Sequence, residues 1–175
     1  MKKIFVINGK PKSGKDTFVK MVSKYAATEN FSSIDKIKEM ALKIGWDGKK
    51  DDAGRWFLGE LKSILSRYND LPYKETEKQI NTFLASNDEI LFIHIREPNE
   101  IARIVKDFGA ESIIVIRNTT ERLSNDSDRY VEEYPSYTYL LDNNKDLKNL
   151  DKVAKGFVKY LREKEITENI GENNV

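Results

Sequence analysis

Near its start the chain reads Lys3-Ile4-Phe5-Val6-Ile7-Asn8, followed at once by Gly9-Lys10-Pro11-Lys12-Ser13-Gly14-Lys15-Asp16-Thr17. The apolar run predicts a strand that is buried on both faces, as in a parallel sheet. Gly9 and Gly14 flank four residues and Lys15 follows them, which is the spacing of a phosphate-binding loop. Glycine permits the tight turns that point backbone N–H groups at a phosphate chain, and Lys15 adds a positive charge for the β- and γ-phosphates.

A helix is predicted directly after this loop, because apolar residues recur there at helical spacing. They are Phe18, Val19, Val22, Tyr25 and Ala26. The N-terminus of such a helix carries a partial positive charge that would face a bound anion. Strand, loop, lysine and helix together favour a phosphate site over an ordinary glycine-rich turn.

The position after the loop lysine departs from the usual pattern. It normally holds Ser or Thr, whose hydroxyl coordinates Mg²⁺, whereas this chain has Asp16 followed by Thr17. A carboxylate binds a metal directly or through water, which makes Asp16 the candidate metal ligand. Thr17 is a candidate hydrogen-bond donor to phosphate, and the sequence leaves open which residue takes which role.

Residues 9–18 resemble the G-x-x-x-S-G-K-D-T segment of P-loop nucleoside and nucleotide kinases. The resemblance is greatest to the viral-type deoxynucleoside monophosphate kinases and their bacterial relatives, and it is weaker over the rest of the chain. It implies ATP and Mg²⁺ as cofactors, with residues 9–17 binding ATP and Lys15 acting in catalysis. The implied reaction is phosphoryl transfer to a small acceptor.

Length and composition favour one compact domain over residues 1–175. Charged residues make up 34% of the chain but the net charge is only +1, which argues against a dedicated nucleic-acid or membrane surface. There is no cysteine, no signal-peptide pattern and no run of about 20 apolar residues. We therefore expect a cytoplasmic protein without a polymeric nucleic-acid or membrane partner. The resemblance implies small-molecule nucleotides as partners, and we expect a monomer or homodimer.

The order of elements predicts an α/β fold of three layers, α/β/α, around a five-stranded parallel sheet. The expected strands are residues 3–8, 30–34, 89–96, 112–116 and 137–142, with helices between them. Residues 35–87 form a helical insertion between the second and third strands. In nucleotide kinases such an insertion covers the acceptor, whereas in any parallel sheet it also serves as the crossover.

Residues at the start of this insertion are candidate acceptor ligands. Ser33, Asp35 and Lys38 resemble a segment that often contacts the acceptor in nucleotide kinases. Asp35 is also placed to be the N-cap of the following helix, and that role is at least as well supported.

A second acceptor candidate lies in the polar loop before the next helix. Arg55 sits near the helix start, where a cation opposes the helix dipole unless an anion compensates it. It resembles the arginine that grips the acceptor phosphate in related kinases, and Lys50 shares the loop. The alternative is a surface ion pair of Arg55 with Asp51 or Asp52.

The third predicted strand ends in His94-Ile95-Arg96, at the sheet edge where α/β proteins bind ligands. The family pattern is Asp-x-Arg, with the Asp organising Mg²⁺, so Arg96 matches and His94 does not. A neutral imidazole is a poor ligand for a hard cation. Either Asp16, Glu97 or water holds the metal, or the site is altered, and His94 is more often a structural residue than a catalytic one.

Residues 117–137 are polar and follow the fourth strand, where nucleotide kinases place a lid. The resemblance implies that one or more of Arg117, Arg122 and Arg129 close over the transferring phosphoryl group, and that Arg96 also neutralises its charge. The alternative is a solvated segment with Arg–Asp pairs. Beyond it, Asn143 and Asn144 would lie near the adenine.

The sequence therefore predicts a kinase that transfers the γ-phosphoryl group of MgATP to a nucleoside monophosphate. One alternative keeps the reaction and changes the acceptor to dephospho-coenzyme A or a phosphorylated metabolite. The other is a non-catalytic ATP-binding module, which His94 in place of an Asp suggests.

Overall fold

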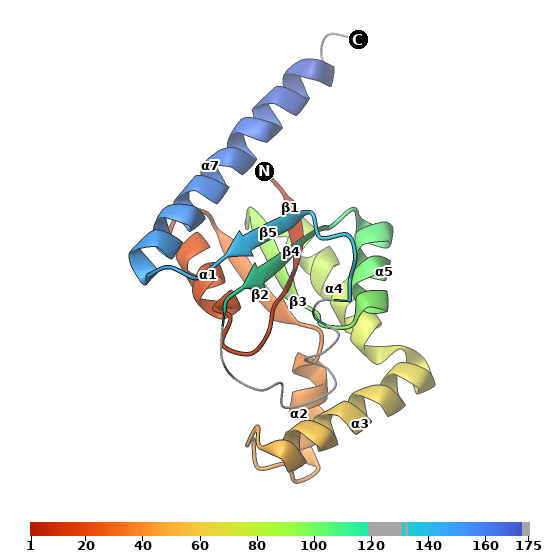
Figure 1. Ribbon diagram of the computed structural model, residues 1–175. Helices are drawn as coiled ribbons and strands as arrows, with labels where there is room; N and C mark the ends of the chain where they lie inside the picture. Colours follow the sequence, from red (N-terminus) through yellow and green to blue (C-terminus); the bar gives the residue numbers. More distant parts are fainter. Residues whose placement is uncertain (119–130, 132, 173–175) are drawn as a thin grey trace.

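The computed structural model describes residues 1–118, 131 and 133–172. Five parallel strands form one sheet in the order β2-β3-β1-β4-β5 (Figure 1). Their bounds are β1 Lys3–Asn8, β2 Thr28–Ser32, β3 Ile90–His94, β4 Glu111–Ile116 and β5 Tyr139–Asp142. The predicted sheet is confirmed. The second strand lies two residues earlier than expected, because β2 pairs with β3 from Thr28 opposite Ile90 to Ser32 opposite His94.

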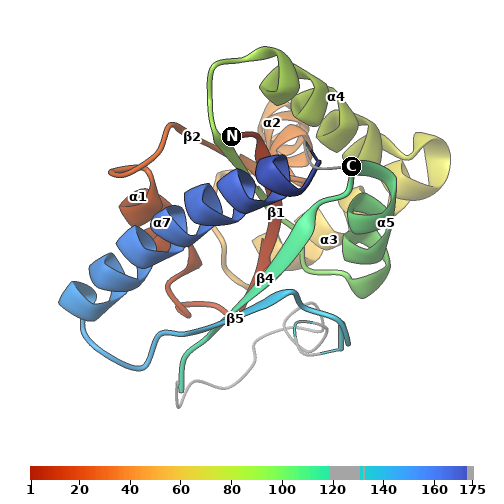
Figure 2. The same ribbon diagram turned by 90° about the horizontal axis from the view of Figure 1, so that it is seen from above.

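Helices cover both faces of the sheet, as predicted. α1 (Lys15–Val22) and α7 (Leu147–Glu172) cover one face, and α4 (Leu71–Ala85) and α5 (Pro98–Phe108) cover the other (Figures 1 and 2). Alternate residues of β1 supply both cores: Phe5 and Ile7 pack with α1 and α7, and Val6 packs with α4 and α5. This explains why β1 is apolar at successive positions. Among the described helices, none is both long and apolar enough to cross a bilayer.

Three helices separate β2 from β3. α2 (Asp35–Lys43) and α3 (Asp52–Asn69) extend past the edge of the sheet, and α4 returns to its face (Figure 1). The two extending helices have a small core of their own, built from Ile37, Ala41 and Leu58. Asp70 is left-handed, with φ 58°, and separates α3 from α4. α4 begins at Leu71 rather than Tyr73, because Pro72 is tolerated in a first turn.

Asp35 is not the N-cap of α2, so that prediction is wrong. The cap position is Ile34, which makes no side-chain cap bond, and Asp35 is the first helical residue. Its carboxylate instead accepts a hydrogen bond from the Ser32 backbone N–H at 2.9 Å and pairs with Lys38 Nζ at 2.7 Å. The turn after β2 therefore uses Asp35 to fasten the strand to the helix.

Candidate active site

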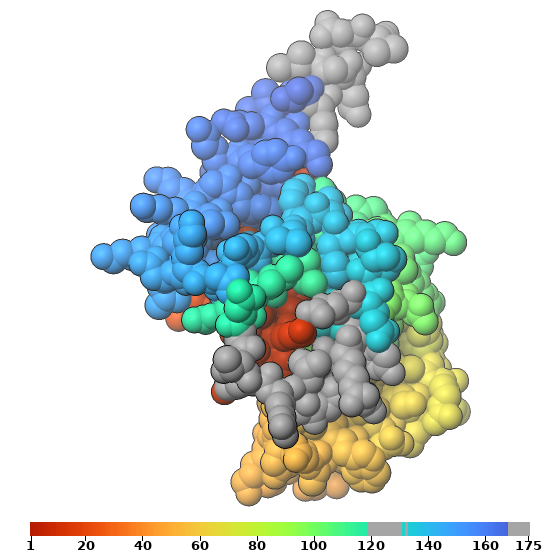
Figure 3. Space-filling view, viewed as in Figure 1, coloured from red at the N-terminus to blue at the C-terminus, as the bar shows by residue number. Residues whose placement is uncertain are grey.

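The loop of residues 9–14, between β1 and α1, turns through three residues of positive φ. These are Gly9 at 153°, Lys12 at 60° and Gly14 at 95°. A Cβ on Gly9 would lie 2.6 Å from both Ser13 Oγ and the Val115 carbonyl oxygen, so no larger residue fits. The loop therefore curls tightly over the ends of β1 and β4. In the space-filling view part of the N-terminal segment, in red, is visible next to the green β4 segment (Figure 3).

Lys15 reaches back across this loop. Its Nζ donates hydrogen bonds to the carbonyl oxygens of Gly9 at 2.8 Å and Lys10 at 3.4 Å. α1 begins at Lys15, so the first backbone N–H groups of that helix lie beside the same loop. Ser13 is 1% exposed, and its Oγ has no hydrogen-bond partner among the described residues. The arrangement combines a cation, helix N-terminal amides and an unused hydroxyl, all of which suit an anion.

The side chain of Asn143 holds the loop of residues 9–14 in place through a hydrogen bond to its backbone. It lies in the turn between β5 and α7, is 6% exposed, and donates Nδ2 to the Ser13 carbonyl oxygen at 2.7 Å. Its own backbone N–H donates to the Ile116 carbonyl at 2.8 Å. A Cβ on Gly14 would collide with its amide nitrogen. The side chain of Asn143 thus lies against the loop of residues 9–14, and its expected place near the adenine stays a prediction.

We expect Asn143→Ala to lower the free energy of unfolding by about 1–3 kcal/mol, because it leaves the buried Ser13 carbonyl without a donor. The loop would also lose its anchor, which should weaken the binding of anions there. Urea unfolding and calorimetric titration with a nucleotide measure the two effects. Asn81→Ala, at an exposed position of α4, is the matched control and should change both by less. Equal effects of the two substitutions would contradict this role of Asn143.

Asn8 joins three segments at the end of β1. It is fully buried; its Oδ1 accepts from the Gly9 N–H at 2.8 Å, and its Nδ2 donates to the Arg96 carbonyl at 3.2 Å and to Tyr137 Oη at 2.8 Å. Tyr137 in turn donates to the Val131 carbonyl at 2.9 Å. Burial raises the pKa of Tyr137 to about 12. The roles of Asn8 and Tyr137 in this network were not predicted from the sequence, although a buried strand that ends in Asn is a usable signal.

His94 ends β3 beside the loop. Its side chain is 16% exposed, its Nε2 lies 2.8 Å from Asn30 Oδ1, and its Nδ1 lies 3.7 Å from Asp16 Oδ1. Burial lowers the pKa of His94 to about 4, against the opposing attraction of Asp16. The imidazole is therefore neutral at pH 7. Asp16 is 88% exposed and reaches out from the first turn of α1.

This burial predicts a pH-dependent loss of stability. The unfolded chain takes up a proton on His94 below about pH 6.5, and the folded chain only near pH 4, so unfolding is favoured as the pH falls between these values. The loss from this one group reaches about 3 kcal/mol. Urea unfolding of the wild type and His94→Gln from pH 7 to pH 4 measures it. The wild type should lose more stability than the variant, and parallel losses would contradict the prediction.

The predicted acceptor residues fall into two places. Ser33 is buried next to His94 and donates both its backbone N–H and its Oγ to the His94 carbonyl, each at 3.3 Å. Lys50 and Arg55 lie together at the start of α3, where Arg55 Nε donates to the Lys50 carbonyl at 2.8 Å. Asp51, an alternative partner for Arg55, is the N-cap of α3 and accepts from the Gly54 N–H at 2.9 Å.

Two of the four predicted catalytic arginines lie among the described residues. Arg96 is half-buried and lies two residues beyond the end of β3, and Arg117 is exposed directly after β4. Both therefore lie at the carboxyl edge of the sheet that also carries the loop. Arg122 and Arg129 lie outside the described residues, as does most of the predicted lid.

A buried ionic cluster that the sequence analysis missed ties the insertion to the sheet. Lys62 of α3 is 12% exposed and pairs with Glu97 at 2.6 Å and Glu100 at 2.9 Å, at the start of α5. Burial raises the pKa of Glu100. Burial also acts to raise the pKa of Glu97, but the charge of Lys62 and the hydrogen bonds to this carboxylate together outweigh burial, so the pKa of Glu97 is lowered. Lys62 lies far from both glutamates in the sequence, so no local pattern indicates the cluster.

Metal-binding residues are sparse in the described chain. Residues 1–118, 131 and 133–172 contain no group of three or more His, Cys, Asp or Glu side chains placed to hold an ion. Mg²⁺ commonly uses one or two carboxylates together with substrate phosphates and water. Asp16 fits that use, because its carboxylate is exposed beside the loop.

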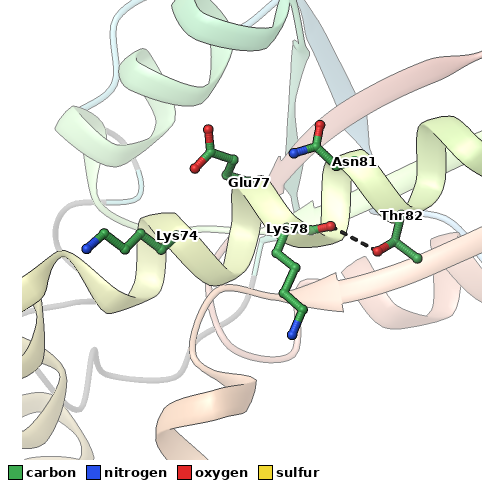
Figure 4. Close-up of a pocket in the computed structure, with 5 residues that line it drawn as sticks. All are labelled: Lys74, Glu77, Lys78, Asn81 and Thr82. Atoms are coloured by element: carbon green, nitrogen blue, oxygen red, sulfur yellow. Dashed lines mark hydrogen bonds between the residues drawn. The ribbon is translucent and has the colours of Figure 1, made fainter.

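Two hollows lie outside the loop. An open one of about 470 Å³ runs along the surface of α4 and holds none of the predicted site residues (Figure 4). Its lining residues are Lys74, Glu77, Lys78, Asn81 and Thr82. A cavity of about 50 Å³ lies on the insertion side and includes Ser33 and Glu100 in its wall. The candidate site is therefore defined by the loop and its charges rather than by a deep pocket.

The sheet order, together with a glycine-rich loop between β1 and α1, defines a P-loop-type α/β fold. A sugar kinase from a Janibacter species matches with a TM-score of 0.53 and 10% identity, over 91% of this chain and 95% of that kinase. A gluconokinase from Sinorhizobium meliloti matches with 0.52 and 11%, over 95% and 97%. A shikimate kinase from Bacteroides thetaiotaomicron matches with 0.50 and 11%, over 93% and 98%.

These similarities establish that the chain shares the fold of the three kinases over almost its whole length. Searches of protein families and of curated proteins find no match. At 10–11% identity the likeness concerns the fold, so the activity has to be argued from the site.

Proposed function

We propose that this protein transfers the γ-phosphoryl group of ATP to a small acceptor. The observation that carries the proposal is the loop of residues 9–14, with Lys15 lying across it and the N-terminus of α1 beside it. Backbone N–H groups, a helix N-terminus and a lysine together suit a polyphosphate. The fold that the chain shares with solved sugar, gluconate and shikimate kinases supports the same reaction.

In this proposal residues 9–17 hold the donor phosphates, and Mg²⁺ enters with ATP beside Asp16. Lys15, Arg96 and one or more of Arg117, Arg122 and Arg129 neutralise charge on the transferring group. Phosphoryl transfer needs little covalent participation by the protein, because positioning and electrostatic stabilisation supply most of the acceleration. Two of these groups, Arg96 and Arg117, lie at the carboxyl edge of the sheet shortly after β3 and β4.

The acceptor in this proposal is a nucleoside monophosphate, including the deoxy forms, held between the loop and the insertion α2–α4. Its support is the resemblance of residues 9–18 and of Arg96 to nucleotide kinases. Arg55, with Lys50, would anchor the acceptor phosphate from the start of α3.

The test is incubation of the protein with γ-labelled ATP and a panel of acceptors. The panel contains the nucleoside and deoxynucleoside monophosphates, dephospho-coenzyme A, and phosphorylated and unphosphorylated sugars. Label in a nucleoside diphosphate supports the proposal, and label only in a non-nucleotide acceptor would keep the reaction but replace the acceptor. ATP binding without label transfer to any acceptor would favour a non-catalytic nucleotide-binding protein.

A further inference from the structure

His94 is held in one tautomer. Its Nε2 lies 2.8 Å from the side-chain oxygen of Asn30, and a carboxamide oxygen only accepts hydrogen bonds. Nε2 must therefore carry the hydrogen and donate it to Asn30. In the neutral ring this leaves Nδ1 as a bare acceptor with its lone pair in the plane of the imidazole.

The Nδ1 acceptor of His94 faces a second acceptor, a carboxylate oxygen of Asp16. Nδ1 lies 3.7 Å from a carboxylate oxygen of Asp16, which is too long for a direct hydrogen bond. Two electron-rich atoms thus face each other beside the loop, and a proton donor or a cation placed at their side could contact both.

The negative charges near this position favour a cation over a neutral proton donor. Asp16 follows Lys15 at the start of α1, so its carboxylate stands next to the place where the loop would hold phosphates. Carboxylate and phosphate repel each other, and a neutral donor such as a substrate hydroxyl would leave that repulsion in place. A divalent cation removes it, and the water molecules on such a cation are strong hydrogen-bond donors.

We propose that Asp16 and His94 form a mixed magnesium site, in which Asp16 binds the ion of the bound nucleotide through oxygen and His94 Nδ1 accepts a hydrogen bond from a metal-bound water. The inference rests on the proposed binding of nucleotide at the loop. It gives His94 a positioning role that does not require the hard ion to coordinate nitrogen. Asn30, at the far side of the ring, fixes the tautomer that this role needs.

The chain suits a direct test because His94 is its only histidine. Protein labelled with ¹⁵N-histidine gives one pair of ring-nitrogen signals in a long-range proton–nitrogen NMR spectrum. At pH 7 we expect a protonated Nε2 and an unprotonated Nδ1. Adding ADP in excess EDTA should leave the Nδ1 signal in place, and adding ADP with excess Mg²⁺ should shift it as the hydrogen bond forms.

Two substitutions give an independent readout, the affinity of the ADP complex for Mg²⁺ by calorimetry. Asp16→Asn and His94→Phe should each weaken that affinity by about 10- to 100-fold. His94→Gln retains an acceptor oxygen and should recover part of the loss. Asp52→Asn, which alters an exposed acid in the first turn of α3, is the matched control and should have no effect.

Three results would each overturn the magnesium site without overturning the proposed function. They are a proton on Nδ1, an equal shift of Nδ1 with ADP in EDTA, and unchanged Mg²⁺ affinity in both Asp16→Asn and His94→Phe. An equal shift in EDTA would assign the donor to the nucleotide itself. If ADP fails to bind the wild type at all, the proposed function falls and the magnesium site falls with it.

Discussion

Lys15→Ala is expected to lower kcat/KM for phosphoryl transfer by about 10²- to 10³-fold. The ammonium group lies across the loop, within 2.8 Å of the Gly9 carbonyl oxygen, and is the charge placed to meet the β- and γ-phosphates. Its removal leaves the helix N-terminus and backbone amides as the remaining anion-binding groups of the loop. Because the charge that develops on the transferring group is then less well stabilised, kcat should fall as well as affinity. Steady-state kinetics with the acceptor identified by the label-transfer experiment measures the change.

Lys20→Ala is the matched control for this substitution. Lys20 lies on the same helix, in its last turn, and is exposed. Both variants should unfold at a urea concentration close to that of the wild type. Unchanged kinetics in Lys15→Ala, or an equal loss in Lys20→Ala, would remove Lys15 from the mechanism.

Asn8→Ala is expected to have the largest effect on stability, a loss of about 3–5 kcal/mol in the free energy of unfolding. Asn8 is fully buried and satisfies the Gly9 N–H, the Arg96 carbonyl and the Tyr137 hydroxyl. Alanine would leave these groups without that partner and create a cavity among the ends of β1, β3 and the segment after β4. Urea unfolding measures the loss.

Tyr137→Phe separates the parts of this network. It removes the hydroxyl that accepts from Asn8 and donates to the Val131 carbonyl, while the ring keeps its packing. A loss of about 1–2 kcal/mol is expected, well below that of Asn8→Ala. If the two variants were equally stable, Asn8 would not hold the three segments together as described.

The sheet was predictable from the sequence because its strands have a strong local signal. β1 and β3 are buried on both faces and are almost wholly apolar, so their existence and parallel arrangement follow from composition and from the helices between them. β2 carries the weaker pattern Thr-Glu-Asn-Phe-Ser, and its bounds are set by its pairing with β3. The second strand was therefore predicted two residues too late in the sequence.

The loop was predictable for the same reason, since its glycines and lysine are contiguous. The residues that support it were not, because they come from distant parts of the chain. Asn143 lies 130 positions from Ser13, and Tyr137 lies 129 positions from Asn8. Lys62 meets its two glutamates only once α3 has packed against the start of α5. Such pairs are properties of the folded chain rather than of any local pattern.

Asp35 shows how a local rule fails when a competing bond is available. An acid before an apolar helical repeat predicts an N-cap, and this carboxylate was free to take that role. It bonds instead to the backbone N–H of Ser32 and to Lys38, one turn ahead in α2. The helix consequently starts at Asp35 itself.

If the loop of residues 9–14 and Lys15 form a polyphosphate site, calorimetric titration with adenosine, AMP, ADP and ATP in the presence of Mg²⁺ should show an affinity that rises sharply once the β-phosphate is present. Lys15→Ala should remove most of this gain. Adenosine binding as tightly as ATP, or ATP failing to bind, would contradict the polyphosphate site.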